Sequence, residues 1–228
     1  MRALFIQNCN SETYLQNSLS GKHRKELRRQ EKRLAELGAL EYVSLHPDEP
    51  ATPWIDKFLK LEGLGWKGEE GSAFASNDLD EAYFRTITQE AHRKKQLMIL
   101  ALNLNGKPIA MKCNFIAGKG SYAFKIAFDE AFKAYSPGVH LEMENVRLLH
   151  RLPDIQWMDS CATPNHFMIN RLWTARRTIK NIRIGCSGAM GNLFLASIPL
   201  FRWLKRGIIE GSTQSHKNKA GEREEVNS

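Results

Sequence analysis

Residues 125–144 read KIAFDEAFKAYSPGVHLEME, a stretch that joins the end of a predicted strand to a short loop and a predicted helix. Ser136 and Pro137 suit the N-cap and the first position of a helix. The backbone N–H groups of a first helical turn lack partners within the helix, and they lie at the positive end of the helix dipole. Such a turn can hold a phosphate or pyrophosphate. Because Pro137 has no N–H, we expect the donors to be the backbone N–H groups of Gly138, Val139 and His140. An ordinary capped helix is the alternative.

The segments on both sides of this stretch define an α/β fold. Asn105-Gly106 is a strong signal for a two-residue hairpin turn. It lies in a predicted antiparallel meander of three strands, residues 97–104, 108–117 and 121–128. The helix after the loop covers residues 139–151, and a short buried strand over 155–158 ends at Asp159.

The remaining periodicity predicts further elements before and after this block. Before it we expect a helix over 20–37, a strand over 40–45, a helix from 52 and a long helix over 77–96. After it we expect a turn and helix through Trp173, a strand over 178–184 and an apolar helix over 192–209. We therefore predict an irregular lead over 1–17, a single domain over 18–210 and a disordered tail over 211–228.

Composition excludes several classes of protein. The chain has 228 residues, of which 42 % are hydrophobic and 25 % are charged, so it can form an ordinary globular core. We find no apolar run long enough for a membrane span and no signal peptide. The four scattered cysteines form no C-x-x-C pair, which argues against a metal site and a disulfide scaffold and predicts reduced thiols in the cytoplasm.

The predicted helix near the N-terminus is strongly basic. Between Lys22 and Arg33 it carries seven Lys or Arg residues against two Glu, within a net charge of +8 for the chain. A solvated helix face is one interpretation. The other is a surface for an anionic partner such as tRNA.

Four side chains close to the strand ends are candidates for acid–base chemistry. Asp129 and Glu130 end one core strand, and Asp159 ends the next, so we expect them to converge where ligands bind in such sheets. Lys125 alternates with its neighbours on the third strand, and we expect it to face the side of the sheet on which a substrate would bind. The alternatives are a loop-capping role for Asp129, a turn-capping role for Asp159 and a solvated Lys125.

Two other features are candidates for substrate contact. Trp66 and Lys67 lie on a glycine-rich loop that is either a mobile lid over the acceptor or a surface loop with a packed Trp. His140 is either a base or a residue of the helix surface, and we favour the surface. Cys161 adjoins Asp159 without a flanking base, so we interpret it as a small core residue.

Several motifs together resemble a known family. The segments LNLNGKPIAMKCNF (102–115), SYAFKIAFDEAFKAYSPGVHLEMENVRLL (121–149) and IQWMDSCA (155–162) resemble the acetyltransferase domain of cellulose-biosynthesis (CelD-like) proteins. This is a branch of the GCN5-related N-acetyltransferase (GNAT) superfamily and lies close to the FemABX transferases. The basic helix and the Gly65-Trp-Lys-Gly68 loop extend the resemblance to about residues 18–185.

This resemblance implies a mixed, mostly antiparallel sheet flanked by helices, and an acyl-CoA donor, most simply acetyl-CoA. It implies that residues 135–140 form the cofactor site, namely Tyr135, Ser136, Pro137, Gly138, Val139 and His140. Asp129, Lys125 and Asp159 become the catalytic candidates, while Trp66, Lys67 and Glu130 become the substrate-binding ones. The reaction would be direct attack of an acceptor amine on the thioester, with no metal.

Three other hypotheses stay open. The first is a FemABX-like transferase that uses aminoacyl-tRNA. The second is a non-catalytic, basic nucleic-acid-binding module, although we find no recognised binding motif. The third is a degenerate transferase half, because many family members have a longer N-terminal half and only about twenty residues precede the basic helix here. The chain is then either a minimal form or a fragment.

Overall fold

The computed structural model describes residues 1–65, 71, 73–180, 182 and 196–198. The chain divides into two compact units, Met1–Ile179 and Lys180–Ser228. In the second unit, residues 196–198 are helical. The end of the predicted domain at 210, most of the predicted last helix and the predicted tail lie outside the described residues, so these remain predictions.

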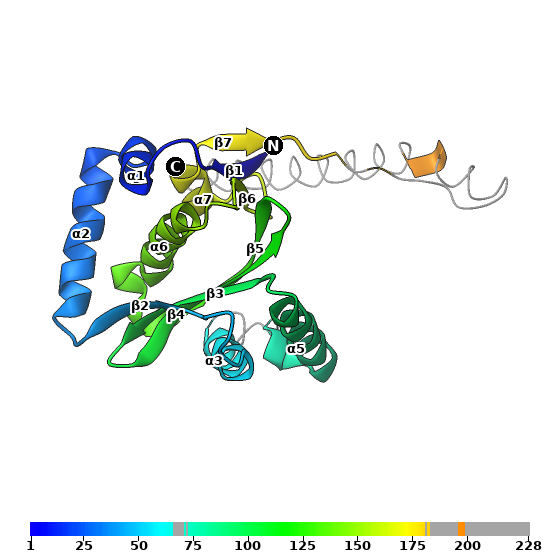
Figure 1. The fold of residues 1–228 in the computed structure, drawn as a ribbon. Helices are drawn as coiled ribbons and strands as arrows, with labels where there is room; N and C mark the ends of the chain where they lie inside the picture. Colours follow the sequence, from blue (N-terminus) through cyan, green and yellow to red (C-terminus); the bar gives the residue numbers. More distant parts are fainter. Residues whose placement is uncertain (66–70, 72, 181, 183–195, 199–228) are drawn as a thin grey trace, which may run out of the picture. The chain divides into compact units, whose positions relative to one another are not determined.

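The first unit is built around a seven-stranded sheet (Figure 1). Its strands follow the spatial order β2-β3-β4-β5-β6-β1-β7, and every pair is antiparallel except β5–β6. The strands are β1 (Arg2–Ile6), β2 (Leu40–Ser44), β3 (Leu97–Leu104), β4 (Lys107–Ala117), β5 (Gly120–Phe128), β6 (Trp157–Asp159) and β7 (Ala175–Arg177). This architecture confirms the predicted mixed, mostly antiparallel sheet.

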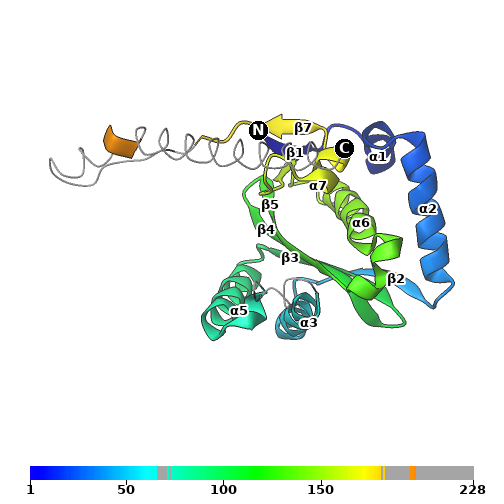
Figure 2. The ribbon, with the colours of Figure 1, turned by 180° about the vertical axis from the view of Figure 1, so that it is seen from behind.

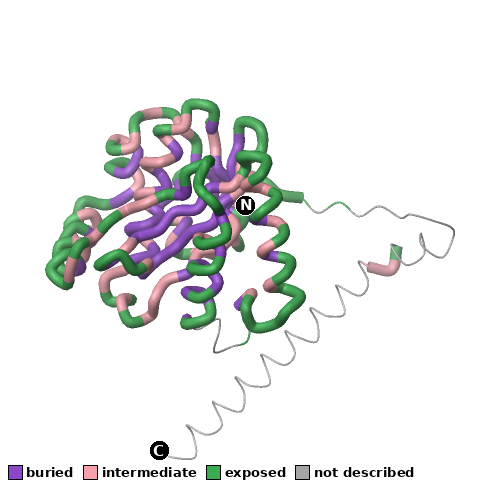
Figure 3. The backbone as a smooth tube through the Cα atoms, turned by 60° about the horizontal axis from the view of Figure 1, so that its bottom comes forward, coloured by how far each residue is buried: buried purple, intermediate pink, exposed green. Residues whose placement is uncertain are grey.

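Helices cover both faces of this sheet (Figures 1 and 2). One face carries α3 (Thr52–Gly63), α5 (Asp78–Arg93) and the 3-10 turn η1 (Phe74–Ser76). The other face carries α1 (Ser11–Ser18), α2 (Gly21–Ala35), α6 (Pro137–Arg151) and α7 (Phe167–Leu172). The 3-10 helix η2 (Glu130–Tyr135) connects β5 to α6. Figure 3 shows the strands of the sheet as the buried centre between these two layers.

The expected irregular lead over 1–17 is wrong. Arg2–Ile6 forms β1, which lies between β6 and β7 in the sheet, and Ser11–Ser18 forms α1. Phe5 is fully buried, and its ring lies 4.9 Å from that of Tyr14 and 6.2 Å from that of Trp173. Five residues at a chain end carry a weak strand signal by themselves, and here distant partners stabilise the strand.

The predicted strand over 178–184 is displaced. The structure places β7 at Ala175–Arg177 and gives residues 178–180 and 182 no regular structure. The register with β1 pairs Arg2 with Arg177 and Leu4 with Ala175. Pairing with β1 therefore determines where this strand lies. The alternation of polar and apolar residues over 178–184 does not.

A buried polar network anchors α6 to β4. The Lys112 ammonium lies 2.8 Å from a Glu142 carboxylate oxygen, and both side chains are almost completely buried. Asn145 donates to Glu142 at 2.9 Å and accepts from Asn114 at 3.0 Å. Partnered buried charges of this kind are costly to break singly. The network thus sets the position of α6 relative to the central strands.

Candidate functional site

The parallel strands β5 and β6 separate partway along the sheet. They pair only at Gly120–Trp157, Ser121–Met158 and Tyr122–Asp159, after which β6 ends while β5 continues to Phe128. Among the described strands, the second half of β5 therefore has β4 as its only sheet neighbour. The edge of β5 beyond Tyr122, which we call the open edge, carries backbone groups that point away from β4.

The hydrogen-bond pattern identifies one of these backbone groups. The Asp129 N–H donates to the Ile109 carbonyl at 2.9 Å, so Asp129 and Ile109 face each other as a hydrogen-bonded pair. In an antiparallel ladder such pairs alternate with non-hydrogen-bonded ones. Phe128, which lies opposite Ala110, is therefore in a non-hydrogen-bonded pair. Its N–H points toward the open edge.

The first turn of α6 follows β5 through η2, but it has fewer available donors than the sequence suggested. Val139 and His140 both donate their backbone N–H to the Ser136 carbonyl, at 2.9 and 3.2 Å. The expected cradle of three N–H groups is thus wrong. The carbonyl of an N-cap residue accepts the first hydrogen bond of its helix. Because His140 is the fourth residue of α6, its N–H makes that bond and is not available to a ligand. Of the three expected donors, only the Gly138 N–H is left available to a bound anion.

The N-cap residue itself has an unusual backbone. Ser136 has φ +53° and ψ +48°, the left-handed conformation, and its side chain makes no capping hydrogen bond. Its side chain is therefore free of the capping role that we expected. Pro137 and Gly138 are buried, and a Cβ on Gly138 would lie 3.6 Å from Ile126 Cδ1 and from Phe128 Cδ1. The first turn of α6 therefore packs directly on the end of β5.

His140 does not lie on the helix surface, so that expectation is wrong. Its side chain is buried, and Nε2 has no partner among the described residues. Burial lowers the pKa of His140 below its ordinary value of 6.5, against the opposing effect of Glu31. The imidazole is therefore neutral at pH 7.

This lowered pKa predicts a pH-dependent stability. The unfolded chain binds a proton near pH 6.5 while the folded chain resists it, so the contribution of His140 is complete above that pH and is lost as the pH falls. We expect the free energy of unfolding, measured in urea, to fall between pH 7.5 and pH 5. In His140→Gln the fall should be smaller. An identical pH dependence in both proteins would contradict this prediction.

Lys125 lies on the face of the sheet that carries α3. The register between β4 and β5 shifts at Cys113/Asn114, and this bulge places Phe124 and Lys125 on the same face. Phe124 stacks with Phe74 at 5.9 Å, and the Lys125 ammonium lies 4.2 Å above the Phe74 ring. Strict alternation would have separated the two side chains.

Glu62 is a candidate that the sequence analysis missed. Its carboxylate accepts from Lys125 Nζ at 3.0 Å and from the Phe74 N–H at 3.0 Å, and its side chain is 1 % exposed. A cavity of about 20 Å³ is lined by Glu62, Gly65, Phe128, Glu130 and three neighbours. This cavity has room for about one water molecule between the buried carboxylate and residues 126–128 of β5. The only sequence signal was a charged residue on the apolar side of α3, next to Leu61.

Asp129 and Glu130 lie at the corner between β5 and η2. Asp129 accepts from the Ala131 N–H at 2.9 Å and caps η2, which is the alternative that the sequence left open. It also lines a second cavity of about 530 Å³, between α3 and the β3–β4 turn. Glu130 lines the small cavity with Glu62. The structure therefore brings Asp129, Glu130 and Lys125 to the end of β5.

Asp159 does not join this group. It is buried, and its two oxygens lie 3.5 Å from Arg2 and 3.3 Å from Arg177. It also accepts from the Cys161 N–H at 2.9 Å, as in the turn-capping alternative. These partners tie β6 to β1 and β7, so we assign Asp159 a structural role.

Two substrate-binding candidates, Trp66 and Lys67, lie outside the described residues.

The cysteines and the general features of the described residues complete the survey. Cys161 is exposed, which corrects the expectation of a core residue, while burial raises the pKa of the Cys113 thiol to about 12. In the described part of the chain, His, Cys, Asp and Glu form no cluster that could hold a metal ion, and no helix is long and apolar enough to cross a membrane.

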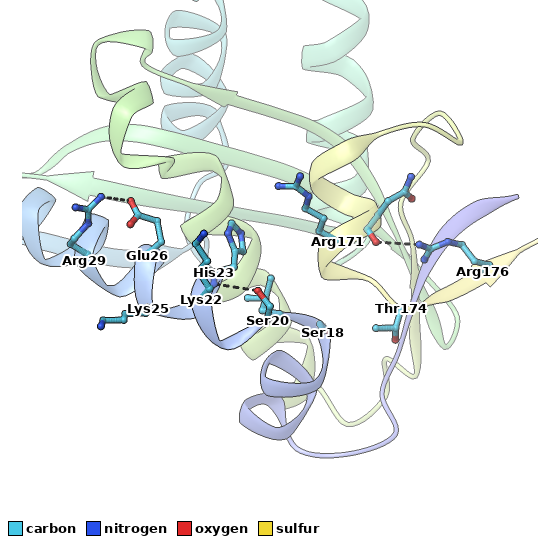
Figure 4. A pocket seen from close by; sticks show the side chains of 12 residues that line it. Ser18, Ser20, Lys22, His23, Lys25, Glu26, Arg29, Arg171, Thr174 and Arg176 are labelled. Atoms are coloured by element: carbon cyan, nitrogen blue, oxygen red, sulfur yellow. Dashed lines mark hydrogen bonds and ion pairs between the residues drawn. The ribbon is translucent and has the colours of Figure 1, made fainter.

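A large cationic cavity lies on the other face of the sheet, between the start of α2 and α7 (Figure 4). Its volume is about 1380 Å³. Its basic lining residues are Lys22, His23, Lys25, Arg29, Arg171 and Arg176. The lining carboxylate of Glu26 pairs with Arg29 at 2.8 Å, so the cavity keeps a net positive charge.

The fold and the site define an α/β domain with a splayed pair of parallel strands. A comparison with protein families identifies it further. The acetyltransferase (GNAT) domain family matches residues 21–167, more than half of the chain. The chain therefore belongs to this family.

Several solved structures are similar to the chain at low sequence identity. FemX matches with a TM-score of 0.52 and 12 % identity, over 73 % of this chain and 55 % of FemX. A conserved protein of unknown function from Bacteroides thetaiotaomicron matches with a TM-score of 0.46 and 16 % identity, over 70 % and 49 %. An aminoglycoside acetyltransferase from an uncultured soil metagenomic sample matches with a TM-score of 0.45 and 15 % identity, over 65 % and 99 %.

These matches concern the fold alone. The chain spans about half the length of the first two of these structures. No curated protein matches the chain.

Proposed function

We propose that the chain is an acyl-CoA-dependent N-acyltransferase, with acetyl-CoA as the simplest donor and an amine as the acceptor. The observation that carries this proposal is the separation of β5 from β6 directly before the first turn of α6. A donor along the open edge meets strand N–H groups at one end and a positive helix end at the other. The family membership supports the same reaction class.

The donor is held by backbone groups in this proposal. The Gly138 N–H and the positive end of α6 attract the pyrophosphate, and Ser136, which makes no capping bond, supplies a hydroxyl beside it. The Phe128 N–H, directed at the open edge, polarises the thioester carbonyl and stabilises the negative charge that develops on its oxygen. The enzyme otherwise supplies proximity.

In this proposal Glu62 acts as the general base and Lys125 as the general acid. An ammonium acceptor must lose a proton before its nitrogen attacks the thioester carbon, and the Glu62 carboxylate takes it. As the new C–N bond forms, the C–S bond breaks and the CoA thiolate leaves. The Lys125 ammonium, 3.0 Å from Glu62, gives a proton to that thiolate and regains one from the acylated nitrogen, which loses its second proton in this step. Glu62 then releases the first proton to solvent. The products are an N-acyl amine and CoA. Asp129, at the same end of β5, is the second candidate base.

Finer assignments also belong to this proposal. The hairpin and loop motifs at 102–115 and 121–149 support a CelD-like branch close to the FemABX transferases. The hypothesis also includes a domain that extends to residue 210 and a cytoplasmic location. The acceptor is a small molecule, a sugar or a compound related to envelope polysaccharide.

Ser136 offers a matched test of the donor site. Asp and Asn have nearly the same shape, and both tolerate the left-handed backbone at this position, so they differ by one charge. In calorimetric titrations with acetyl-CoA, we expect micromolar affinity for the unmodified chain and for Ser136→Asn. Ser136→Asp should bind at least about tenfold more weakly, because its carboxylate faces the pyrophosphate. Equal affinities of the two variants would contradict this placement of the donor.

A specific observation favours a second candidate function, a FemABX-like transferase with an aminoacyl-tRNA donor. The cationic cavity at α2 and α7 suits a phosphodiester backbone. The same titration with uncharged tRNA in place of acetyl-CoA separates the two candidates. Binding of tRNA that weakens steeply with salt, without binding of acetyl-CoA, would replace our proposal with the second candidate.

A further inference from the structure

The cavity of about 530 Å³ next to the end of β5 has a defined chemical character. Its volume lies within the ordinary range of about 300–1,000 Å³ for small-molecule sites. Its floor is apolar, formed by Leu61, Leu104, Ile109 and Phe132. A hydrated inorganic ion has no apolar surface to match such a floor, so the occupant that fits it has an apolar body.

Three lysines surround this floor. Lys57 and Lys60 come from α3 and Lys107 from the start of β4, and all three are exposed. None of the three forms an ion pair with another described residue. Three unpaired ammonium groups around one cavity favour an anionic group on the occupant and oppose a polycation.

The cavity also touches the proposed reaction centre. Asp129 lines it, and Asp129 directly follows Phe128, whose N–H faces the open edge. Leu61 lines both this cavity and the small cavity that contains Glu62. One oxygen of Asp129 accepts from the Ala131 N–H, and the carboxylate gives the cavity a single negative group against the three lysines. That group suits an ammonium.

We propose that this cavity is the acceptor site and that the acceptor is an amine with an apolar body and an anionic group, either a phosphate or a carboxylate. The lysines bind the anionic group, and Asp129 holds the ammonium in the cavity that shares Leu61 with the small cavity of Glu62. This inference rests on the proposed acyl transfer. The bond changes are the same: the amine nitrogen gains the acyl group and loses two protons, the first to Glu62 and the second through Lys125, and CoA leaves as the thiol.

Paired amines test this proposal. Each pair has an apolar body and differs only in the anionic group: tyramine O-phosphate with tyramine, and phenylalanine with phenylalaninamide. Kanamycin serves as the polycation. Binding of each amine to the CoA-saturated protein is measured by calorimetry, and acetyl transfer by release of the CoA thiol. The two pairs distinguish a phosphate from a carboxylate as the recognised group.

A charge-matched pair of variants locates the effect. Lys57→Gln/Lys60→Gln/Lys107→Gln removes the three cavity charges. Lys94→Gln/Lys119→Gln/Lys180→Gln removes three exposed charges that do not line the cavity. We expect at least one anionic amine to bind about tenfold or more tightly than its neutral partner. The cavity variant should lose this preference and the control variant should keep it, with acetyl-CoA affinity unchanged in both.

The outcomes separate the two proposals. If acetyl-CoA binds but neutral amines or kanamycin bind as well as the anionic amines, or no amine of the panel binds, the acceptor inference is overturned while the donor site stands. If the cavity variant keeps the full preference for the anionic amine, the site lies elsewhere and the inference is also overturned. If acetyl-CoA does not bind the unmodified chain, the proposed function fails together with this inference.

Discussion

Glu62→Gln should lower the rate of acetyl transfer about a hundredfold or more, with little change in acetyl-CoA affinity. Glu62 is the buried carboxylate that lines the small cavity with residues 126–128 of β5, and its loss removes the group that accepts the proton of the acceptor amine. Gln keeps the shape and still accepts a hydrogen bond from the Phe74 N–H, so the local backbone retains its partner. The measurement is kcat with the best amine of the panel, beside the dissociation constant for acetyl-CoA.

Glu81→Gln is the matched control for this experiment. Glu81 on α5 also pairs with a cation, since it accepts from Arg85 at 2.7 Å, but it lines none of the described cavities. We expect its kcat to stay within a factor of about two of the unmodified protein, because this half-buried surface pair lies outside the described cavities and a surface pair contributes little. Thermal unfolding of both variants separates lost chemistry from lost fold. A folded Glu62→Gln protein with full kcat would exclude Glu62 as the base.

The second large effect concerns stability. Glu142→Leu should lower the free energy of unfolding by about 3–5 kcal/mol, because it leaves the buried Lys112 ammonium without its partner. The double variant Lys112→Met/Glu142→Leu should recover most of this loss, since a well-packed apolar pair can replace a buried ion pair. Urea unfolding of both proteins measures the two values.

The stabilities of the single and the double variant show whether the Lys112–Glu142 ion pair anchors α6 to β4. If the single variant is as stable as the unmodified chain, the ion pair does not anchor the helix. If the double variant stays as unstable as the single one, the amide groups of Asn114 and Asn145 need the charges to stay ordered. Recovery in the double variant is the result that the fold predicts.

The sequence predicted the central strands and α6 well because their signals are local. Asn105-Gly106 does form the turn between β3 and β4, and both residues have the positive φ that such a turn requires. Pro137 does lie in the first turn of α6. The ends of the sheet depended on distant pairing instead. β1 forms because it pairs with β6 and β7, and β7 forms because it pairs with β1, which no local pattern records.

The site was predicted less completely, for two physical reasons. The bulge in β5 turned Lys125 toward α3, and a period-two alternation cannot show such a shift. Glu62 approaches Lys125 from 63 positions away in the sequence, through the packing of α3 on the sheet. Asp159 had the expected position at a strand end, but its carboxylate forms ion pairs with Arg2 of β1 and Arg177 of β7.

The position of the donor is the central claim, and amide hydrogen exchange with and without acetyl-CoA tests it most directly. We predict that acetyl-CoA slows exchange at the Phe128 amide and in residues 135–138, at the open edge and the first turn of α6. Exchange in α5, on the far side of α3, should stay unchanged. Slowed exchange confined to the start of α2 and to α7, around the cationic cavity, would contradict this account.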